Sequence, residues 1–263
     1  MLEVPAIDPV IFSIGPVAVR WYGLMYVGGF LGGWWLARGR CTRPDSPVTP
    51  QQVDDLVFYV MLGVIAGGRL GYTFIYGWGE ILADPLYVIR IWEGGMSFHG
   101  GLVGVMVAMW LFGRRHGKTL VELTDFVAPF VPIGLGLGRI GNFINGELWG
   151  KATDLPWAFN VGGVGRHPTQ LYEALLEGLV LFVILYTYSA KPRPYRAVSG
   201  MFLLWYGLFR FWVEFYRIPD AHMGDDGYLV GWLTTGQLLS APMIVAGAIL
   251  LFLAYRRPTA ATA

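Results

Sequence analysis

Long apolar stretches alternate with short polar segments along the whole chain. The apolar stretches cover residues 17–37, 56–77, 95–113, 125–142, 170–190, 198–217 and 232–255. Each has close to the ~20 apolar residues that an α-helix needs to cross the hydrocarbon core of a bilayer. The pattern predicts an all-α integral membrane protein, in which residues 1–263 form a single polytopic membrane domain, a seven-transmembrane-helix bundle.

The composition supports a membrane protein and excludes several other classes. Only 14% of the 263 residues are charged and 55% are hydrophobic, whereas a soluble domain carries roughly 25% charged residues. The single cysteine, Cys41, excludes a disulfide scaffold. A net charge of +1 is too small for a basic nucleic-acid binder, so no nucleic-acid partner is expected.

The distribution of charge predicts the orientation of the bundle. With an odd number of passes, the two termini lie on opposite sides of the membrane. The connections at 38–55, 114–125, 191–196 and 256–257 hold eleven basic and five acidic residues, and the rest of the chain holds eight basic and thirteen acidic ones. Because positively charged loops stay in the cytoplasm, the N-terminus is expected outside and the C-terminus in the cytoplasm.

The longest polar stretch, at about residues 147–168, lies on the outer side in this topology. Its length allows a small head but not a soluble catalytic domain. Any chemistry is therefore expected within the membrane or at its edge.

Ionisable side chains in the apolar stretches are the main functional candidates, because each costs about 2.5–3.5 kcal/mol at the centre of a membrane helix. Those in the outer halves are Arg69, His99, Arg139, Glu147, Arg210 and Glu214. From Tyr206 to Arg217, polar residues recur at intervals of four, four and three, which places them on one helix face. This stripe predicts either an internal ion pair that locks helices together or a cavity lining for an anionic headgroup. Arginine suits the second role, since its planar guanidinium binds phosphate through two parallel hydrogen bonds.

A glycine-rich segment precedes a second group of polar residues. Gly136, Gly138 and Gly141 match the G-x-G-x-x-G pattern of dinucleotide-binding proteins, but that site requires a preceding strand and a βαβ unit, which a series of membrane helices does not provide. Glycines at this density instead permit close helix contact or close approach to a ligand. Helix packing alone does not explain the polar residues that follow, which are Arg139, Asn142, Asn145 and Glu147, so the segment predicts a site.

His99 and Tyr22 each allow two interpretations. His99 is either a structural hydrogen-bonding residue or a general base, because histidine titrates near neutral pH. Tyr22 belongs either to the site or to the aromatic belt at the membrane interface. The four histidines are scattered and no cysteine pair is present, so neither a metal nor a cofactor is expected.

Five segments carry a resemblance to a known family. The most specific is 138–150, Gly-Arg-Ile-Gly-Asn-Phe-Ile-Asn-Gly-Glu-Leu-Trp-Gly, and the others are 21–26, 94–101, 166–173 and 206–215. Together they resemble the bacterial prolipoprotein diacylglyceryl transferase family over nearly the whole chain and in the family's order. The sequence departs from the family at Arg20, where many members have a histidine.

The resemblance implies a seven-helix bundle in the bacterial inner membrane, with a periplasmic N-terminus, a cytoplasmic C-terminus, a small periplasmic head and an active site that faces the periplasm. It implies that a diacylglyceryl group moves from phosphatidylglycerol to the lipobox cysteine thiol in the signal peptide of a preprolipoprotein. A thioether forms and sn-glycerol 1-phosphate leaves. The implied partners are phosphatidylglycerol, these signal peptides and membrane lipids.

The resemblance also implies roles for individual residues. The implied catalytic positions are His99 as the proposed base, Tyr22, Tyr206, Arg210 and Glu214. The implied phosphatidylglycerol-binding positions are Arg139, Asn142, Glu147 and Gly150. On this basis we expect Arg139 and Arg210 to hold the phosphate, and Glu147 and Glu214 to orient those arginines.

Two other classes of protein remain as alternatives. An anion or lipid transporter would use the same intramembrane arginines, although such proteins usually contain internal repeats or paired broken helices, and the sequence has no evident repeat. An intramembrane hydrolase would need a nucleophile and base such as Ser97 and His99. Because these residues are two apart, they point away from each other on a helix.

Overall fold

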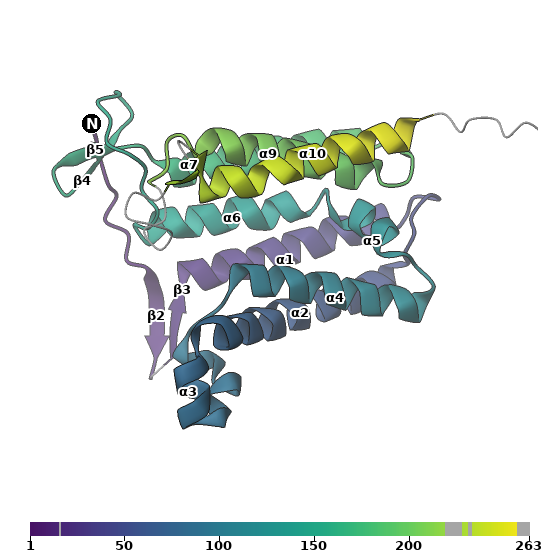
Figure 1. Cartoon of the computed structure of the whole chain (residues 1–263), viewed down its shortest axis with the longest axis horizontal. Helices are drawn as coiled ribbons and strands as arrows, with labels where there is room; N and C mark the ends of the chain where they lie inside the picture. The colour runs from purple at the N-terminus through teal and green to yellow at the C-terminus, as the bar shows by residue number, and fades with distance from the viewer. Residues whose placement is uncertain (16, 219–227, 231–232, 257–263) are drawn as a thin grey trace, which may run out of the picture. The chain divides into compact units, whose positions relative to one another are not determined.

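The computed structural model describes residues 1–15, 17–218, 228–230 and 233–256. Its helices are α1 (Trp21–Arg40), α2 (Pro50–Tyr76), α3 (Trp78–Ala83), η1 (Pro85–Ile89), η2 (Ile91–Glu93), α4 (Phe98–His116), α5 (Leu120–Val127), α6 (Val131–Ile144), α7 (Thr169–Glu173), η3 (Ala174–Val180), α8 (Leu181–Tyr188), α9 (Ala197–Val213) and α10 (Thr235–Tyr255). Its strands are β1 (Leu2–Glu3), β2 (Val10–Ile14), β3 (Val17–Arg20), β4 (Phe159–Val161), β5 (Val164–Arg166), β6 (Tyr228–Val230) and β7 (Leu233–Thr234). The element labels are those of Figure 1.

The protein is mostly helical, as predicted, and each predicted stretch contains a helix. Short strands, which the sequence analysis did not predict, flank the helices. The first helix begins at Trp21 rather than at residue 17, since β3 pairs antiparallel with β2. The stretch at 125–142 contains two helices that separate at 128–130, and the last helix begins at Thr235, while residue 232 lies outside the described residues.

Three helical segments of the described chain are long and apolar enough to cross a membrane, namely Pro50–Tyr76, Thr169–Tyr188 and Thr235–Tyr255. A fourth span results if α5 and α6 are counted as one bent segment. The protein is therefore a membrane protein by its helices, and the full set of seven passes stays a prediction.

The chain forms two compact units, and one of them consists of Ala37–Phe126. Here α2 and α4 lie side by side (Figure 1). Glycines allow their backbones to approach, because a Cβ atom on Gly63 would lie 2.6 Å from the carbonyl oxygen of Gly104. Close packing of small residues is the usual way in which membrane helices associate, since lipid supplies no hydrophobic force between them.

Arg69 is used for the fold of this unit rather than left for a ligand. Its guanidinium is buried and donates to backbone carbonyl groups of the segment between α2 and α4, those of Tyr87, Val88, Gly94 and Gly95. These bonds offset the cost of burying the charge. Arg69, which the sequence analysis counted among the functional candidates, therefore has a structural role.

The second unit comprises Met1–Leu36 and the chain from Val127 onward. In it α6 packs on α7 and η3, and α9 packs along α10. A Cβ on Gly178 of η3 would lie 2.6 Å from the Cα of Gly136 in α6, so both positions require glycine. The polar stretch after α6 contains the β4–β5 hairpin, which β1 extends as a parallel strand.

We expect Gly63→Ala to destabilise the Ala37–Phe126 unit. The added Cβ meets backbone rather than a movable side chain, and overpacking of this kind costs about 1–3 kcal/mol. Gly79→Ala in α3 is the matched control, because nothing lies within 4 Å of the added Cβ and alanine favours a helix by up to about 1 kcal/mol. Thermal unfolding in detergent micelles should show a lower Tm for Gly63→Ala alone. Equal Tm values for the two variants would contradict the close contact.

Candidate functional site

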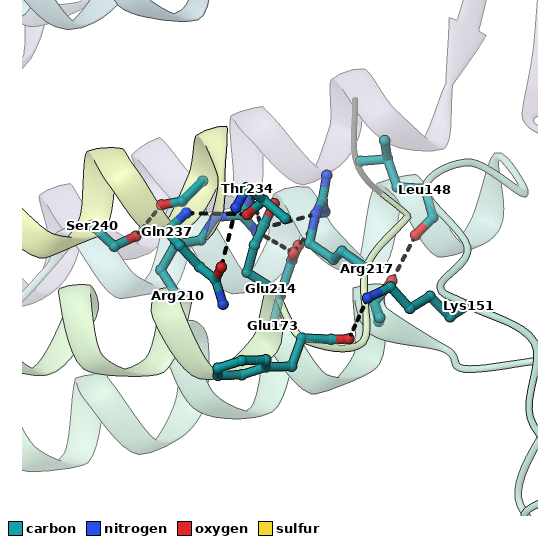
Figure 2. A network of polar contacts seen from close by, with 12 residues as sticks. Leu148, Lys151, Glu173, Arg210, Glu214, Arg217, Thr234, Gln237 and Ser240 are labelled. Atoms are coloured by element: carbon teal, nitrogen blue, oxygen red, sulfur yellow. Dashed lines mark hydrogen bonds and ion pairs between the residues drawn. The ribbon is translucent and has the colours of Figure 1, made fainter. Parts of the chain in front are cut away.

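One buried carboxylate, that of Glu173 at the end of α7, contacts three arginines. Arg139 of α6 approaches with its Nε, 2.6 Å from Glu173 Oε2. Arg210 of α9 and Arg217 after it donate through their Nη1 atoms to Glu173 Oε1, at 2.6 and 2.7 Å. Figure 2 shows Arg210, Arg217 and Glu173 in this network. Because the Glu173 side chain is 0% exposed, its charge is compensated almost entirely by these arginines.

Glu214 supplies the second carboxylate of the network. It pairs with Arg210 Nη2 at 2.9 Å and with Arg217 Nε at 3.5 Å. Arg210, Glu214 and Arg217 of the predicted polar stripe therefore lie together, although α9 ends at Val213 and Arg217 lies beyond it. The carboxylate lies against the first turn of α10, where a Cβ on Gly236 would come within 2.5 Å of its carboxyl carbon. Glycine at this position lets a negative charge approach a helix N-terminus, which is electrostatically favourable.

The network has more hydrogen-bond donors than acceptors. Each guanidinium carries several N–H donors in a planar fork, whereas each carboxylate offers two oxygens. Arg139 is the most accessible of the three arginines, with 22% of its side chain exposed against 15% for Arg210 and 8% for Arg217. An anion that reaches Arg139 would therefore meet a donor-rich and weakly hydrated environment, in which arginine binds phosphate well.

Glu147 does not orient an arginine, contrary to our expectation. Its carboxylate accepts hydrogen bonds from Asn142 Nδ2 at 3.3 Å and Asn145 Nδ2 at 2.9 Å, and no ion pair links it to the described residues. Its backbone carbonyl accepts from Gln170 of α7. Glu173 takes the place that the sequence analysis gave to Glu147, while Glu147 fixes the turn after α6 and remains exposed.

Gly150 lies at a tightly packed point of the same turn. A Cβ there would come within 2.5 Å of the Tyr216 carbonyl oxygen and 2.8 Å of His167 Cβ. Its N–H donates to the His167 carbonyl at 2.8 Å. Gly150 thus joins the turn after α6 to the segment that follows α9, which carries Arg217, by backbone contacts that a larger residue would prevent.

Burial lowers the pKa of His167, whose ring lies 3.1 Å from the hydroxyl of Tyr172 through Nδ1. A lowered pKa favours the neutral imidazole at this position.

The two predicted tyrosines belong to the same unit as the network. Tyr22 lies in the first turn of α1, and its ring packs against Gly141 of α6, where an added Cβ would lie 2.8 Å from Tyr22 Cδ2. The Tyr22 hydroxyl is 3.3 Å from that of Tyr26. Tyr206 lies one turn before Arg210 on α9 and stacks on Phe202, with ring centroids 5.6 Å apart. The absence of a side chain at Gly141 thus lets Tyr22 approach α6 beside Asn142.

His99 belongs to the other unit and is the second residue of α4, where it is exposed. Its ring contacts that of Phe98. Ser97, the possible nucleophile of the hydrolase alternative, caps this helix by accepting a hydrogen bond from the Gly100 N–H at 3.1 Å. A hydroxyl that serves as an N-cap is explained by the helix itself.

The sequence analysis missed Glu173 as a site residue and gave no role to Glu177. Both are 0% exposed and lie four residues apart. Glu173 directly precedes the π-helical stretch η3, and Glu177 lies within it. Two acidic residues at helical spacing inside an apolar stretch were the available signal, and π-helical turns are often found at functional sites.

No group of three or more His, Cys, Asp or Glu side chains in the described part of the chain could hold a metal ion. The network is instead built from arginine and glutamate on membrane helices. Its composition defines a membrane protein with a cluster of paired arginine and glutamate side chains inside it.

Comparison with known proteins identifies the family. Residues 9–253 match the family model described as prolipoprotein diacylglyceryl transferase. The chain is 57% identical to the phosphatidylglycerol–prolipoprotein diacylglyceryl transferase of Ectopseudomonas mendocina over 98% of this chain and 97% of that one. It is 56% identical to the protein of the same name from Pseudomonas aeruginosa PAO1, over 99% and 98% of the two chains. The chain belongs to the prolipoprotein diacylglyceryl transferase family, which confirms the resemblance.

We expect Glu173→Gln to destabilise the protein strongly. The variant removes the charge that compensates three buried or partly buried arginines, and loss of one partner from a buried ion pair costs about 3–5 kcal/mol. Glu177→Gln is the matched control, because it changes the same atoms one turn away, at a carboxylate that has no hydrogen-bond partner in the described part of the chain. Unfolding by denaturant in micelles measures both variants. A cost for Glu177→Gln as large as that for Glu173→Gln would contradict the central role of Glu173.

Proposed function

We propose that this protein transfers the sn-1,2-diacylglyceryl group of phosphatidylglycerol to the thiol of the lipobox cysteine in preprolipoproteins. The products are a thioether-linked lipoprotein precursor and sn-glycerol 1-phosphate. The observation that carries the proposal is the buried arginine network on membrane helices, in a chain that covers almost all of relatives named for this reaction.

The reaction is a substitution at a glyceryl carbon. The thiolate sulfur attacks that carbon, the carbon–oxygen bond breaks, and the electron pair leaves with the phosphate. Arg139 and Arg210 hold the phosphate in this proposal and stabilise the charge that develops on its oxygen. Glu173 and Glu214 hold the arginines in position through the ion pairs described above.

The remaining predicted residues shape the same site. Asn142, Glu147 and Gly150 belong to the turn after α6 and would place the headgroup beside Arg139. Tyr22 approaches that turn through Gly141, and Tyr206 extends the polar face of α9 below Arg210. We assign these residues to positioning of the lipid rather than to bond making.

His99 is our proposed base for the thiol. A free thiol with a pKa near 8.5 is only a few per cent thiolate at neutral pH. An imidazole that takes the proton raises the concentration of the nucleophile. No cofactor or metal takes part in this proposal.

We also infer that all seven predicted stretches cross the inner membrane. The N-terminus and the site then face the periplasm and the C-terminus faces the cytoplasm. This orientation rests on the excess of basic residues in one set of connections. It presents the site to signal peptides that emerge on the outer side, and the short β4–β5 hairpin with β1 would form the small periplasmic head.

The proposed activity is tested by mixing purified protein with phosphatidylglycerol vesicles and a lipobox peptide, followed by mass measurement of the peptide. We expect a mass gain of one diacylglyceryl group, which disappears when the lipobox cysteine is replaced by serine. Arg139→Ala should lower the rate by about 10²–10³-fold, as loss of one transition-state donor does.

Arg43→Ala is the matched control for Arg139→Ala, because Arg43 pairs with Asp45 in a polar connection outside the network. Its rate should equal that of the unaltered protein. The proposed function would be overturned if this protein left the peptide unmodified under conditions in which an active relative modifies it. Full activity in Arg139→Ala would remove only the phosphate role of that arginine.

His99→Ala should lower the rate by about 10²–10⁴-fold if the imidazole is the base. The loss should be smaller at alkaline pH, because more of the peptide thiol is then ionised without help. His116→Ala, at the end of α4, controls for loss of a histidine from the same helix. Rates for His99→Ala that match the unaltered protein at neutral pH would exclude His99 as an obligatory base.

A further inference from the structure

Glu177 is a buried carboxylate that the proposed mechanism does not use. Its side chain is 0% exposed, and neither of its oxygens has a hydrogen-bond partner among the described residues. Glu173, one turn earlier, is equally buried but contacts three arginines. Since an ionised carboxylate is costly to bury without partners, the position of Glu177 needs an explanation.

The surroundings of Glu177 are the arginine network itself. The helices packed on η3 supply the polar and charged groups that interact electrostatically with Glu177. These groups are Glu173 of α7, Arg139 of α6, Tyr206 and Arg210 of α9, and Arg217 after α9. The α8 segment that continues η3 carries no charged residue. Glu177 therefore lies near the arginines without forming an ion pair with any of them.

The charge of the network depends on the state of Glu177. Arg139, Arg210 and Arg217 are balanced by Glu173 and Glu214 except for one positive charge. An ionised Glu177 cancels that charge, whereas a neutral Glu177 leaves it for a ligand. A phosphodiester carries one negative charge, so the network balances it when Glu177 is neutral and leaves it uncompensated when Glu177 is ionised.

We propose that an anionic phosphate and a proton bind this site together, with the proton on the carboxyl group of Glu177. The proton comes from solvent and adds to a Glu177 carboxylate oxygen as the phosphate reaches the arginines, and it is released when the phosphate leaves. No other bond changes. The inference rests on the phosphate site of the proposed function, and it makes Glu177 a residue that sets the charge of the site rather than a catalytic residue.

Thermodynamic linkage provides the test. If phosphate binding favours the protonated state of the protein, the protein must take up protons when the ligand binds. Purified protein in weakly buffered micelles is mixed with micellar phosphatidylglycerol, and a pH-sensitive dye reports the protons taken up per bound lipid across a pH series. Diacylglycerol, which lacks the phosphate, serves as the control lipid. We expect uptake of up to one proton per bound phosphatidylglycerol, and none with diacylglycerol.

Glu177→Gln should lose this uptake, because an amide cannot accept the proton in the same way. Glu122→Gln is the matched control, since Glu122 lies in the other unit and contacts Thr119. It should take up protons as the unaltered protein does. Equal proton uptake by Glu177→Gln and the unaltered protein would overturn the inference. So would binding of phosphatidylglycerol with no proton uptake at any pH of the series.

A second measurement covers the case in which Glu177→Gln does not fold. Infrared difference spectra of the unaltered protein, with and without phosphatidylglycerol, should gain the carbonyl stretch of a protonated carboxylic acid. Its absence would overturn the inference. Failure of phosphatidylglycerol to bind at all would overturn both the inference and the phosphate site, whereas transfer activity without proton uptake would overturn the inference alone.

Discussion

The contact of three arginines with Glu173 is the interaction on which the rest of the site depends. Charges inside a membrane protein are stable only where opposite charges and hydrogen bonds replace water. Glu173 draws Arg139 of α6 toward Arg210, near the end of α9, and Arg217, which follows that helix. Three segments that are far apart in the sequence therefore converge on one carboxylate, and the excess of guanidinium donors faces whatever anion enters.

Glycine positions allow this convergence. Gly178 and Gly136 bring η3 against α6, Gly236 lets Glu214 approach the start of α10, and Gly150 lets the turn after α6 contact the end of α9. Each contact involves backbone or a carboxylate on the other side, so a methyl group at the glycine would separate the elements. The charged residues supply the attraction, and the glycines determine how closely their helices can meet.

Much of the fold and part of the site could be predicted from the sequence. Apolar length locates the helices, and the four-four-three spacing after Tyr206 placed Arg210 and Glu214 on one face. Spacing along one helix says nothing about a partner on another, so Glu173 was missed and its role was given to Glu147. Strands such as β3 were missed because four residues beside an apolar helix carry no distinct pattern. Arg69 was overvalued, since its carbonyl partners lie 18 to 26 residues away.

Glu173 and Glu177 show how neighbouring carboxylates acquire different roles from the same membrane environment. Both are fully buried on one helical segment, but only Glu173 meets the arginines directly. A fully paired network would be stable and would hold no preference for an added anion. A network with one carboxylate left unpaired can change its charge by one proton, which lets it remain balanced both without and with a bound phosphate. The cost of burying Glu177 without a partner is therefore consistent with a site that must take in a charged headgroup and later release a charged product.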